Sequence, residues 1–315
     1  MKLFRTMYCS RIWLVSMLLF FSIFTVGAQE LPLKSVEDSL ATLMKKIYSD
    51  SPVSVREMAN DEFIKLFEAT VARVDAFDYS FDSLKYIGKV VSEDKKIKVF
   101  SWNFPLSGGY QKYYGFILLK NKKGELRLVE LTDNRKVIGN PIKDILSPNS
   151  WMGALYYSVI DASYKGQTYY VLLGFDFNNL FTSKKIIDVL RIGERGELTF
   201  GSDVFYVGES SLSRIIFEFS ARATMMLRYI PESQTIVFDH LSPSRPDYAE
   251  NFQYYGPDFS YDGFRFEKGK WVYVRNLDLR NPKREPVKPI KSDENFVQPG
   301  FIYKSKGGLP MIIKK

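Results

Sequence analysis

Cysteine and histidine are almost absent from this chain of 315 residues. The single cysteine is Cys9, and the single histidine is His240. A thiol nucleophile, a disulfide framework and a cysteine-rich zinc site are therefore excluded from the chain after Cys9. A multi-histidine zinc site is excluded for the same reason. We expect no metal and no cofactor, and a stability that comes from packing.

Acidic residues are missing from the first 28 residues, which carry only positive charges. An uncharged run from Ile12 to Val26 follows the basic start, and small residues follow the run. This pattern predicts a signal peptide over 1–28 with cleavage before Gln29. A retained membrane anchor is the alternative, but the run is shorter than the roughly 20 residues of a spanning helix. We expect an exported protein of the periplasm or cell envelope of a Gram-negative bacterium, or a secreted one, with no transmembrane span after cleavage.

Nucleic-acid-binding motifs are also absent, although the net charge is +8. Much of the excess positive charge lies in 281–315, where prolines are frequent. Such a composition predicts an extended basic arm. The arm could dock on an anionic surface or be simply solvated, and we expect no nucleic-acid partner.

What the sequence does contain begins with a helical pattern over 29–80. Apolar residues recur there at helical spacing in two stretches, with a break at Ser51-Pro52. Ser35 is placed to cap the first helix. Each helix has one apolar face, so we predict a helical hairpin packed on the segment that follows.

Over 81–280 the apolar residues alternate, and short turn-forming connectors separate the segments. The abundance of tyrosine (20) and phenylalanine (25) also favours strands. Short turns cannot join parallel strands, so we predict an antiparallel meander or sandwich-like β body. The fold class is therefore mainly β (α+β). The clearest predicted strands are 86–91, 97–103, 110–119, 126–131, 155–162, 168–175, 235–241, 264–267 and 271–276.

Some segments permit two interpretations. Ile186–Ile192 fits a strand or the end of a helix that begins at Thr182, and we favour the strand. A strand is predicted at Arg214–Ser220, although segment 210–223 also fits one helix. A short helical turn is expected around Ile142–Leu146.

His240 ends the predicted strand 235–241, on the face opposite Asp239. Its imidazole could serve as a general base with Asp239. No Gly-x-Ser-x-Gly elbow accompanies it, so a structural hydrogen-bonding role is the simpler interpretation.

The segment 251–263 combines aromatic residues, two carboxylates and turn formers, and we expect it to be a loop. Its tyrosines and aspartates could bind a sugar, or they could pack under the sheet and cap turns. Asp258 and Asp262 could also be the acid and base of a glycosidase if they faced each other across a cleft. The predicted ligand-binding residues are Tyr254, Tyr255, Asp258, Tyr261 and Asp262.

Asp176, Asn178 and Asn179 directly follow the predicted strand 168–175. Oxygen ligands at such spacing can begin a calcium loop, but no glycine or distant glutamate completes the motif. A turn held by the Asp and Asn side chains is the favoured interpretation.

Several sequence strings together resemble a group of uncharacterised exported, β-rich proteins of Bacteroidota. The resemblance covers roughly 80–280 and implies an envelope location, with no assigned activity and therefore no catalytic role to transfer. The strings are Trp102–Gly109, Tyr113–Ile117, Leu173–Asp176, Lys184–Leu190, Phe238–Pro243, Tyr255–Asp258 and Gly269–Trp271.

We therefore expect a non-catalytic envelope protein that binds a ligand or partner, with a glycan or another envelope protein as the candidates. The alternative is a glycan-directed hydrolase that uses Asp258 and Asp262, or Asp239 and His240. A third possibility is a scaffold in which the tail docks on a partner.

Overall fold

The computed structural model describes residues 31–279 of the chain. The predicted signal peptide (1–28) and the predicted basic arm (281–315) lie outside the described residues. The helices and strands described below all belong to one compact unit that ends at Leu277, and a second unit begins at Asp278.

Two helices, α2 and α3, pack against each other, which confirms the predicted helical pair. The prediction that Ser35 caps the first helix was wrong, because α2 begins after Pro32. The Pro32 carbonyl accepts the N–H groups of Ser35 and Val36. Proline has a fixed φ that suits the start of a helix, so it sets the boundary here. The helices span Leu33–Ile47 (α2) and Val53–Val71 (α3).

The first sheet is an antiparallel meander in the order β1-β2-β3-β4, as the short connectors predicted. Strand β2 is buried on both faces. Phe100 and Trp102 pack toward the helices, while Val99 belongs to the core on the other side. Trp102 Nε1 donates a hydrogen bond to Asn60 Oδ1 on α3 over 3.0 Å, which fixes the helix on the sheet. The strands span Gly88–Val91 (β1), Ile97–Pro105 (β2), Gln111–Lys120 (β3) and Leu126–Thr132 (β4).

The middle sheet has the order β11-β7-β6-β5, with the short strand β8 paired to β7. Its central strands are also buried on both faces. In β6, Leu172 belongs to the core shared with the first sheet, whereas Val171 and Leu173 belong to the core shared with the third. The strands span Leu155–Tyr164 (β5), Gln167–Asp176 (β6), Thr182–Ile192 (β7), Leu198–Phe200 (β8) and Ile215–Ser220 (β11).

The third sheet has the order β10-β9-β15-β14-β13-β12. All its pairs are antiparallel except β9 with β15, which run parallel. The strands span Phe205–Val207 (β9), Ser210–Leu212 (β10), Leu227–Ile230 (β12), Thr235–Pro243 (β13), Tyr255–Glu267 (β14) and Lys270–Val274 (β15).

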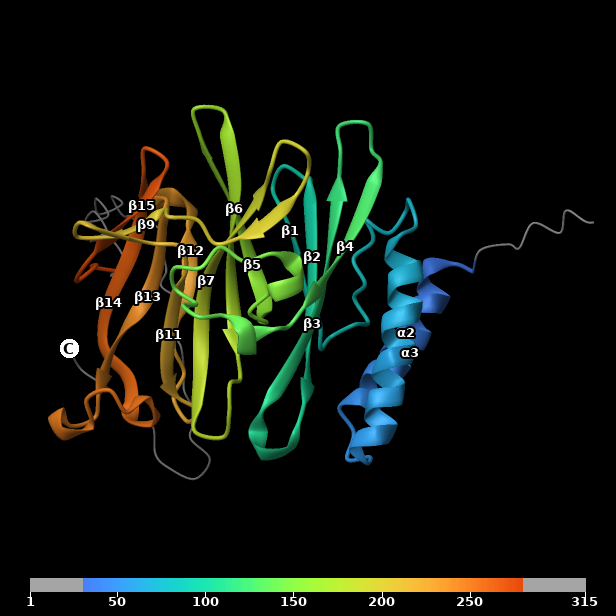
Figure 1. Cartoon of the computed structure of the whole chain (residues 1–315), viewed down its shortest axis with the longest axis horizontal. Helices are drawn as coiled ribbons and strands as arrows, with labels where there is room; N and C mark the ends of the chain where they lie inside the picture. Colours follow the sequence, from blue (N-terminus) through green and yellow to red (C-terminus); the bar gives the residue numbers. More distant parts are fainter. Residues whose placement is uncertain (1–30, 280–315) are drawn as a thin grey trace, which may run out of the picture. The chain divides into compact units, whose positions relative to one another are not determined.

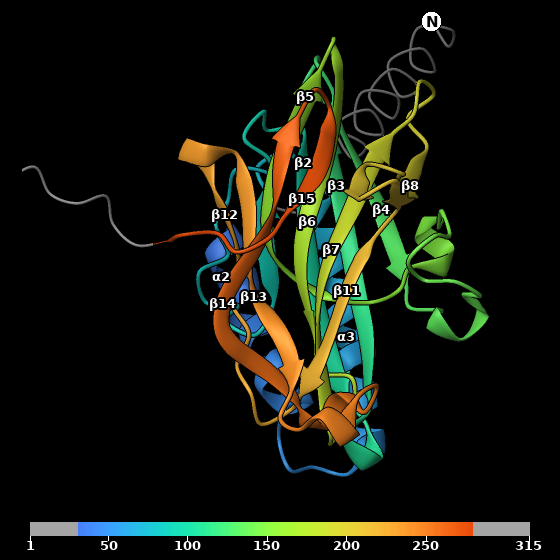
Figure 2. The same cartoon turned by 90° about the vertical axis from the view of Figure 1, so that its left-hand side faces the viewer.

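Three hydrophobic cores lie between the four layers of this unit (Figure 1). The helices cover one face of the first sheet, the middle sheet lies against the other face, and the third sheet covers the middle one. Figure 2 shows the third sheet from its outer side, with the other layers behind it. Because the inner faces are filled by packed side chains, the turns and sheet edges are the places where a ligand can bind.

The structure resolves the ambiguous segments. Thr182–Ile192 is a strand throughout, and 210–223 contains β10 and the strand β11, with no helix. Near the helical turn expected around Ile142–Leu146, the chain makes a single turn at 141–143, in which the Asn140 carbonyl accepts the N–H groups of Lys143 and Asp144. The expectation that 251–263 is a loop was wrong. From Tyr255 onward it is part of β14, because its residues pair with β13.

Candidate functional site

His240 lies beside Asp262, as an acid–base or structural role would require. His240 Nδ1 is 2.7 Å from Asp262 Oδ2, and the Tyr273 hydroxyl donates to the same oxygen over 2.5 Å. The backbone N–H of Asn276 donates to Asp262 Oδ1 over 3.0 Å. Burial alone would raise the pKa of Asp262, but the bonds from Tyr273, His240 and Asn276 outweigh it and lower the pKa. Asp262 is therefore a buried, ionised hydrogen-bond acceptor.

The strand pairing beside this cluster is irregular. Asp239 pairs with Tyr261, whereas Leu241 pairs with Pro257, so β14 carries extra residues that bulge out of the sheet. One of them, Phe259, has a φ of 70° and a side chain that is 93% exposed. Tyr261, one of the predicted ligand-binding residues, is half-buried within the strand.

The other candidate carboxylates are also engaged. Asp258 Oδ1 accepts hydrogen bonds from the backbone N–H and the hydroxyl of Ser260, over 3.0 Å and 2.7 Å. These bonds lower the pKa of Asp258. Asp239 Oδ2 accepts the N–H of Met226 over 2.6 Å. A glycosidase acid needs a raised pKa, and neither Asp258 nor Asp262 has one.

Two of the predicted ligand-binding residues, Tyr254 and Tyr255, line a cleft with a volume of about 620 Å³. We call it the tyrosine cleft. Leu180 and Phe181, from the turn between β6 and β7, line its apolar part. The polar part is lined by Arg222, Ser242, Ser244 and Gln253, among others.

The polar groups of the tyrosine cleft are available to a ligand. Within residues 31–279, the side chains of Arg222, Ser242, Ser244 and Gln253 have no hydrogen-bond or ion-pair partner. Tyr254 is held by stacking on Tyr248, with ring centroids 4.2 Å apart. The cleft therefore combines fixed aromatic surface with free donors and acceptors.

A second cleft, of about 590 Å³, lies between the edges of the first and middle sheets. We call it the aromatic cleft. Tyr48 and Tyr86 line one side with ring centroids 5.0 Å apart, while Tyr157, Phe175 and Phe177 line the other. No local sequence pattern marks this cleft, because its residues come from segments far apart in the chain.

Two amide side chains form the polar floor of the aromatic cleft. The Tyr48 hydroxyl donates to Asn103, both to its carbonyl oxygen (2.7 Å) and to its Oδ1 (3.0 Å). Asn103 Nδ2 donates to Gln111 Oε1 over 2.8 Å, and Gln111 Nε2 donates to the Gly109 carbonyl over 3.1 Å. Each amide nitrogen keeps a second hydrogen for another acceptor.

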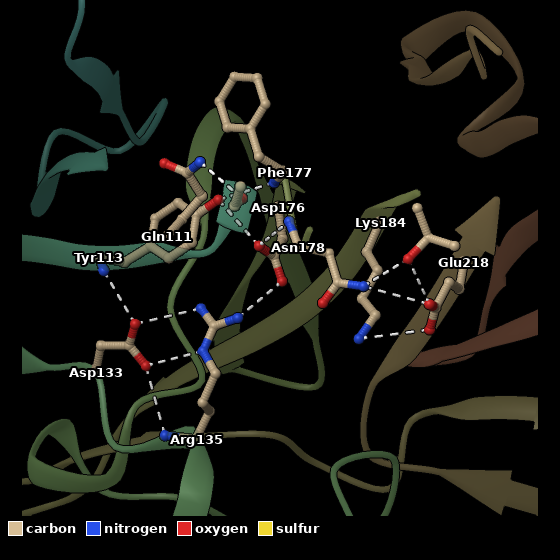
Figure 3. Close-up of polar contacts among 11 residues, drawn as sticks. Gln111, Tyr113, Asp133, Arg135, Asp176, Phe177, Asn178, Lys184 and Glu218 are labelled. Carbon is tan, nitrogen blue, oxygen red and sulfur yellow. Dashed lines mark hydrogen bonds and ion pairs between the residues drawn. The ribbon is translucent and has the colours of Figure 1, made fainter. Parts of the chain in front are cut away.

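The turn between β6 and β7 is held by the buried carboxylate of Asp176 (Figure 3). Asp176 Oδ1 accepts the Tyr113 hydroxyl (3.0 Å) and the N–H of Asn178 (2.8 Å). The Tyr113 oxygen accepts in turn the N–H of Phe177 over 2.9 Å. Asp176 and its partners thereby fix the backbone from which Phe177 extends into the aromatic cleft.

Arg135 neutralises this carboxylate (Figure 3). Its Nη1 is 3.0 Å from Asp176 Oδ2, and its Nε is 3.1 Å from Oδ1 of a second carboxylate, Asp133. Burial alone would lower the pKa of Arg135, but the charges of Asp176 and Asp133 raise it instead. Asp133 also accepts the backbone N–H of Tyr113 over 2.9 Å, so the network is closed by hydrogen bonds.

The far side of the turn is held by asparagines, which confirms the predicted Asp/Asn turn. Asn179 Oδ1 accepts the N–H groups of Phe181 and Thr182, over 2.8 Å and 3.0 Å. Asn178 Nδ2 donates to Thr182 Oγ1 over 2.6 Å and to Glu218 Oε1 over 3.3 Å. Asp176 is occupied by an arginine, so its oxygens are not free to bind calcium.

The predicted site residues therefore separate into two groups. Tyr254 and Tyr255 line the tyrosine cleft, whereas His240 and the carboxylates Asp239, Asp258 and Asp262 line neither cleft. The residues that sequence reasoning missed are Phe177, Leu180 and Phe181, Arg222, Tyr48 and Tyr86. One signal was available, because turns are usually rich in polar residues and glycine, whereas three of the five residues of this turn are large and apolar.

No protein family and no curated protein sequence matches this chain. Within residues 31–279, no helix has the length and apolar character needed to cross a membrane. The same residues contain no group of three or more His, Cys, Asp or Glu side chains placed to hold a metal ion.

Proposed function

We propose that this chain is an exported cell-envelope protein that binds a saccharide, without cleaving it, in the tyrosine cleft. The observation that carries the proposal is the composition of that cleft. Aromatic surface from Tyr254, Tyr255 and Phe181 lies beside unpartnered guanidinium, hydroxyl and amide groups. A sugar ring has apolar faces and a rim of hydroxyls, so it complements both kinds of group.

Binding without cleavage is supported by where the carboxylates lie. No aspartate or glutamate of the described chain lines the tyrosine cleft or the aromatic cleft. Glycoside hydrolysis needs two carboxyl groups on either side of the bond that is cleaved. Asp262, His240 and Tyr273 bond to one another instead, which supports a structural role for that cluster.

The envelope location rests on the sequence. The charge pattern of 1–28 predicts a signal peptide, and the resemblance to exported proteins of Bacteroidota favours a Gram-negative envelope. Both arguments support the proposal independently of the clefts.

The proposal is tested by calorimetric binding of purified protein to a panel of cell-wall and envelope polysaccharide fragments. We expect the double variant Tyr254→Ala/Tyr255→Ala to lose at least tenfold in affinity, because stacking surface is removed. The double variant Asp258→Asn/Asp262→Asn is the matched control and should bind like the wild type. The proposal would be contradicted if only the Asp258→Asn/Asp262→Asn variant lost saccharide binding. It would also be contradicted if the protein released shorter fragments from the polysaccharides.

A further inference from the structure

The turn between β6 and β7 contributes side chains to both clefts. Phe177 lines the aromatic cleft, whereas Leu180 and Phe181 line the tyrosine cleft. All three side chains are exposed, with 42%, 66% and 65% of their surface accessible. The Cα atoms of Phe177 and Phe181 are four residues apart, so they lie within about 15 Å of each other.

This turn is rigid at its base. The buried Asp176 carboxylate, Arg135 and the Tyr113 hydroxyl fix its first residues (Figure 3). Asn179 fixes its last ones. Exposed aromatic side chains on a fixed turn bind a ligand at a low cost in conformational entropy, because little freedom remains to be lost.

Among the described residues, one cationic side chain and no carboxylate line each cleft. Arg222 lines the tyrosine cleft, and Lys85 lines the aromatic cleft. Neither side chain has an ion-pair partner within residues 31–279. Guanidinium and ammonium groups in such positions complement carboxylates on a ligand.

We infer that one acidic polysaccharide chain, with carboxylate-bearing sugar units, runs over the Phe177–Phe181 turn and occupies both clefts. This inference rests on the proposed function and adds a ligand class and a second subsite to it. Arg222 and Lys85 pair with carboxylates of different units, and Phe177 stacks on a ring in the aromatic cleft.

The experiment measures the affinity of the full mature chain for galacturonate and mannuronate oligomers of two to eight units. The matched ligands are the methyl esters of the same oligomers, which have the same length and no charge. For an acidic chain, we expect affinity to rise with length until both clefts are filled and then to stay constant. The esters should bind about tenfold more weakly than the acids.

Four variants assign this effect to the two clefts. Phe177→Ala should abolish the rise in affinity with oligomer length and leave the affinity for the shortest oligomer unchanged. Phe259→Ala, at another exposed phenylalanine, is its control and should leave the affinity for every oligomer unchanged. Arg222→Gln should lower the affinity for the acidic oligomers about tenfold and leave the affinity for the esters unchanged. The exposed Arg228→Gln, which lines neither cleft, is its control.

The outcomes separate the inference from the proposed function. Binding of acids and esters with equal affinity, or affinity independent of length, would overturn the inference and leave saccharide binding intact. Identical behaviour of Phe177→Ala and Phe259→Ala would also overturn it. A chain that binds no saccharide of any class would overturn the proposed function, and the inference with it.

Discussion

Asp176, the last residue of β6, and Asp262, within β14, are both buried carboxylates, and each accepts several hydrogen bonds. Asp262 is bonded to a histidine and a tyrosine, whereas Asp176 is paired with Arg135. The residues after Asp176 extend into two clefts, and Asp262 lies next to neither. In the proposed function, a buried polar cluster therefore supports binding through the surface that it positions, rather than through its own chemistry.

The largest expected effect is that of Asp176→Asn. The change leaves Arg135 with one carboxylate partner in a largely buried site. It also removes the negative charge that accepts the hydrogen bonds of Tyr113 and Asn178 in the turn. Because Asp133 still pairs with Arg135, we expect a loss of about 2–4 kcal/mol in the free energy of unfolding, somewhat less than for a fully broken buried pair. Urea denaturation measures it.

Saccharide affinity should fall together with stability in Asp176→Asn, because Phe177 loses its fixed position. A variant that is fully stable and binds like the wild type would show that Asp176 does not support the site.

Lys98 is a third buried charge, and it differs from Asp176 and Asp262 because no oppositely charged side chain of residues 31–279 forms an ion pair with it. Its ammonium donates to backbone carbonyls, including that of Phe77 over 2.8 Å, and burial lowers the pKa of Lys98 from 10.5 to about 8. The unfolded chain therefore binds more protons between pH 8 and 10.5, so this group makes the protein more stable as pH rises through that range. We expect a gain of about 2 kcal/mol between pH 7 and pH 10 from Lys98.

The measurement compares urea denaturation of the wild type and Lys98→Met at both pH values, so that other titrating groups cancel in the difference. An equal pH dependence in the two proteins would show that Lys98 keeps an ordinary pKa.

Asp262→Asn should have a smaller effect than Asp176→Asn. The single oxygen of the asparagine can still accept the N–H of Asn276, and its amide N–H groups, at the former Oδ2 position, can donate to the Tyr273 oxygen and to His240 Nδ1. We therefore expect a loss of about 1 kcal/mol in the free energy of unfolding. Saccharide affinity should stay unchanged. A loss of affinity without a loss of stability would move the binding site to the His240 cluster and reverse the comparison.

The smallest effect on stability is expected for Phe177→Ala and Phe259→Ala. Both side chains are exposed, so each change should alter the free energy of unfolding by less than about 0.5 kcal/mol. Thermal denaturation of both variants measures these changes. If both variants are as stable as the wild type, a difference in affinity between them reflects contact with the ligand. A strongly destabilised Phe177→Ala would mean that Phe177 is part of the folded core.

Much of the fold follows from local pattern. The alternation in 97–103 and 110–119 predicted neighbouring antiparallel strands, and Ile97 indeed pairs with Leu119. The order of strands in the third sheet was not predictable, since β9 pairs with β15 across a long stretch of sequence. Such pairing depends on how layers pack, and no local signal encodes it.

The two clefts also differ in how far local sequence could predict them. Tyr254 and Tyr255 were predicted from composition, because aromatic and polar residues are dense around them. The aromatic cleft was not, because Tyr48, Gln111 and Phe177 meet only after three elements have packed. Segment 251–263 was mistaken for a loop because its glycines and aspartates form a bulged strand, in which the pairing residues are interrupted.

The most direct test of the account is a calorimetric titration of the mature protein with a galacturonate octamer, followed by prolonged incubation and mass analysis of the octamer. The account predicts saturable binding that weakens about tenfold when Arg222 is replaced by glutamine, and an octamer recovered intact. An octamer that is shortened by the wild type and preserved by His240→Ala or Asp262→Asn would contradict it.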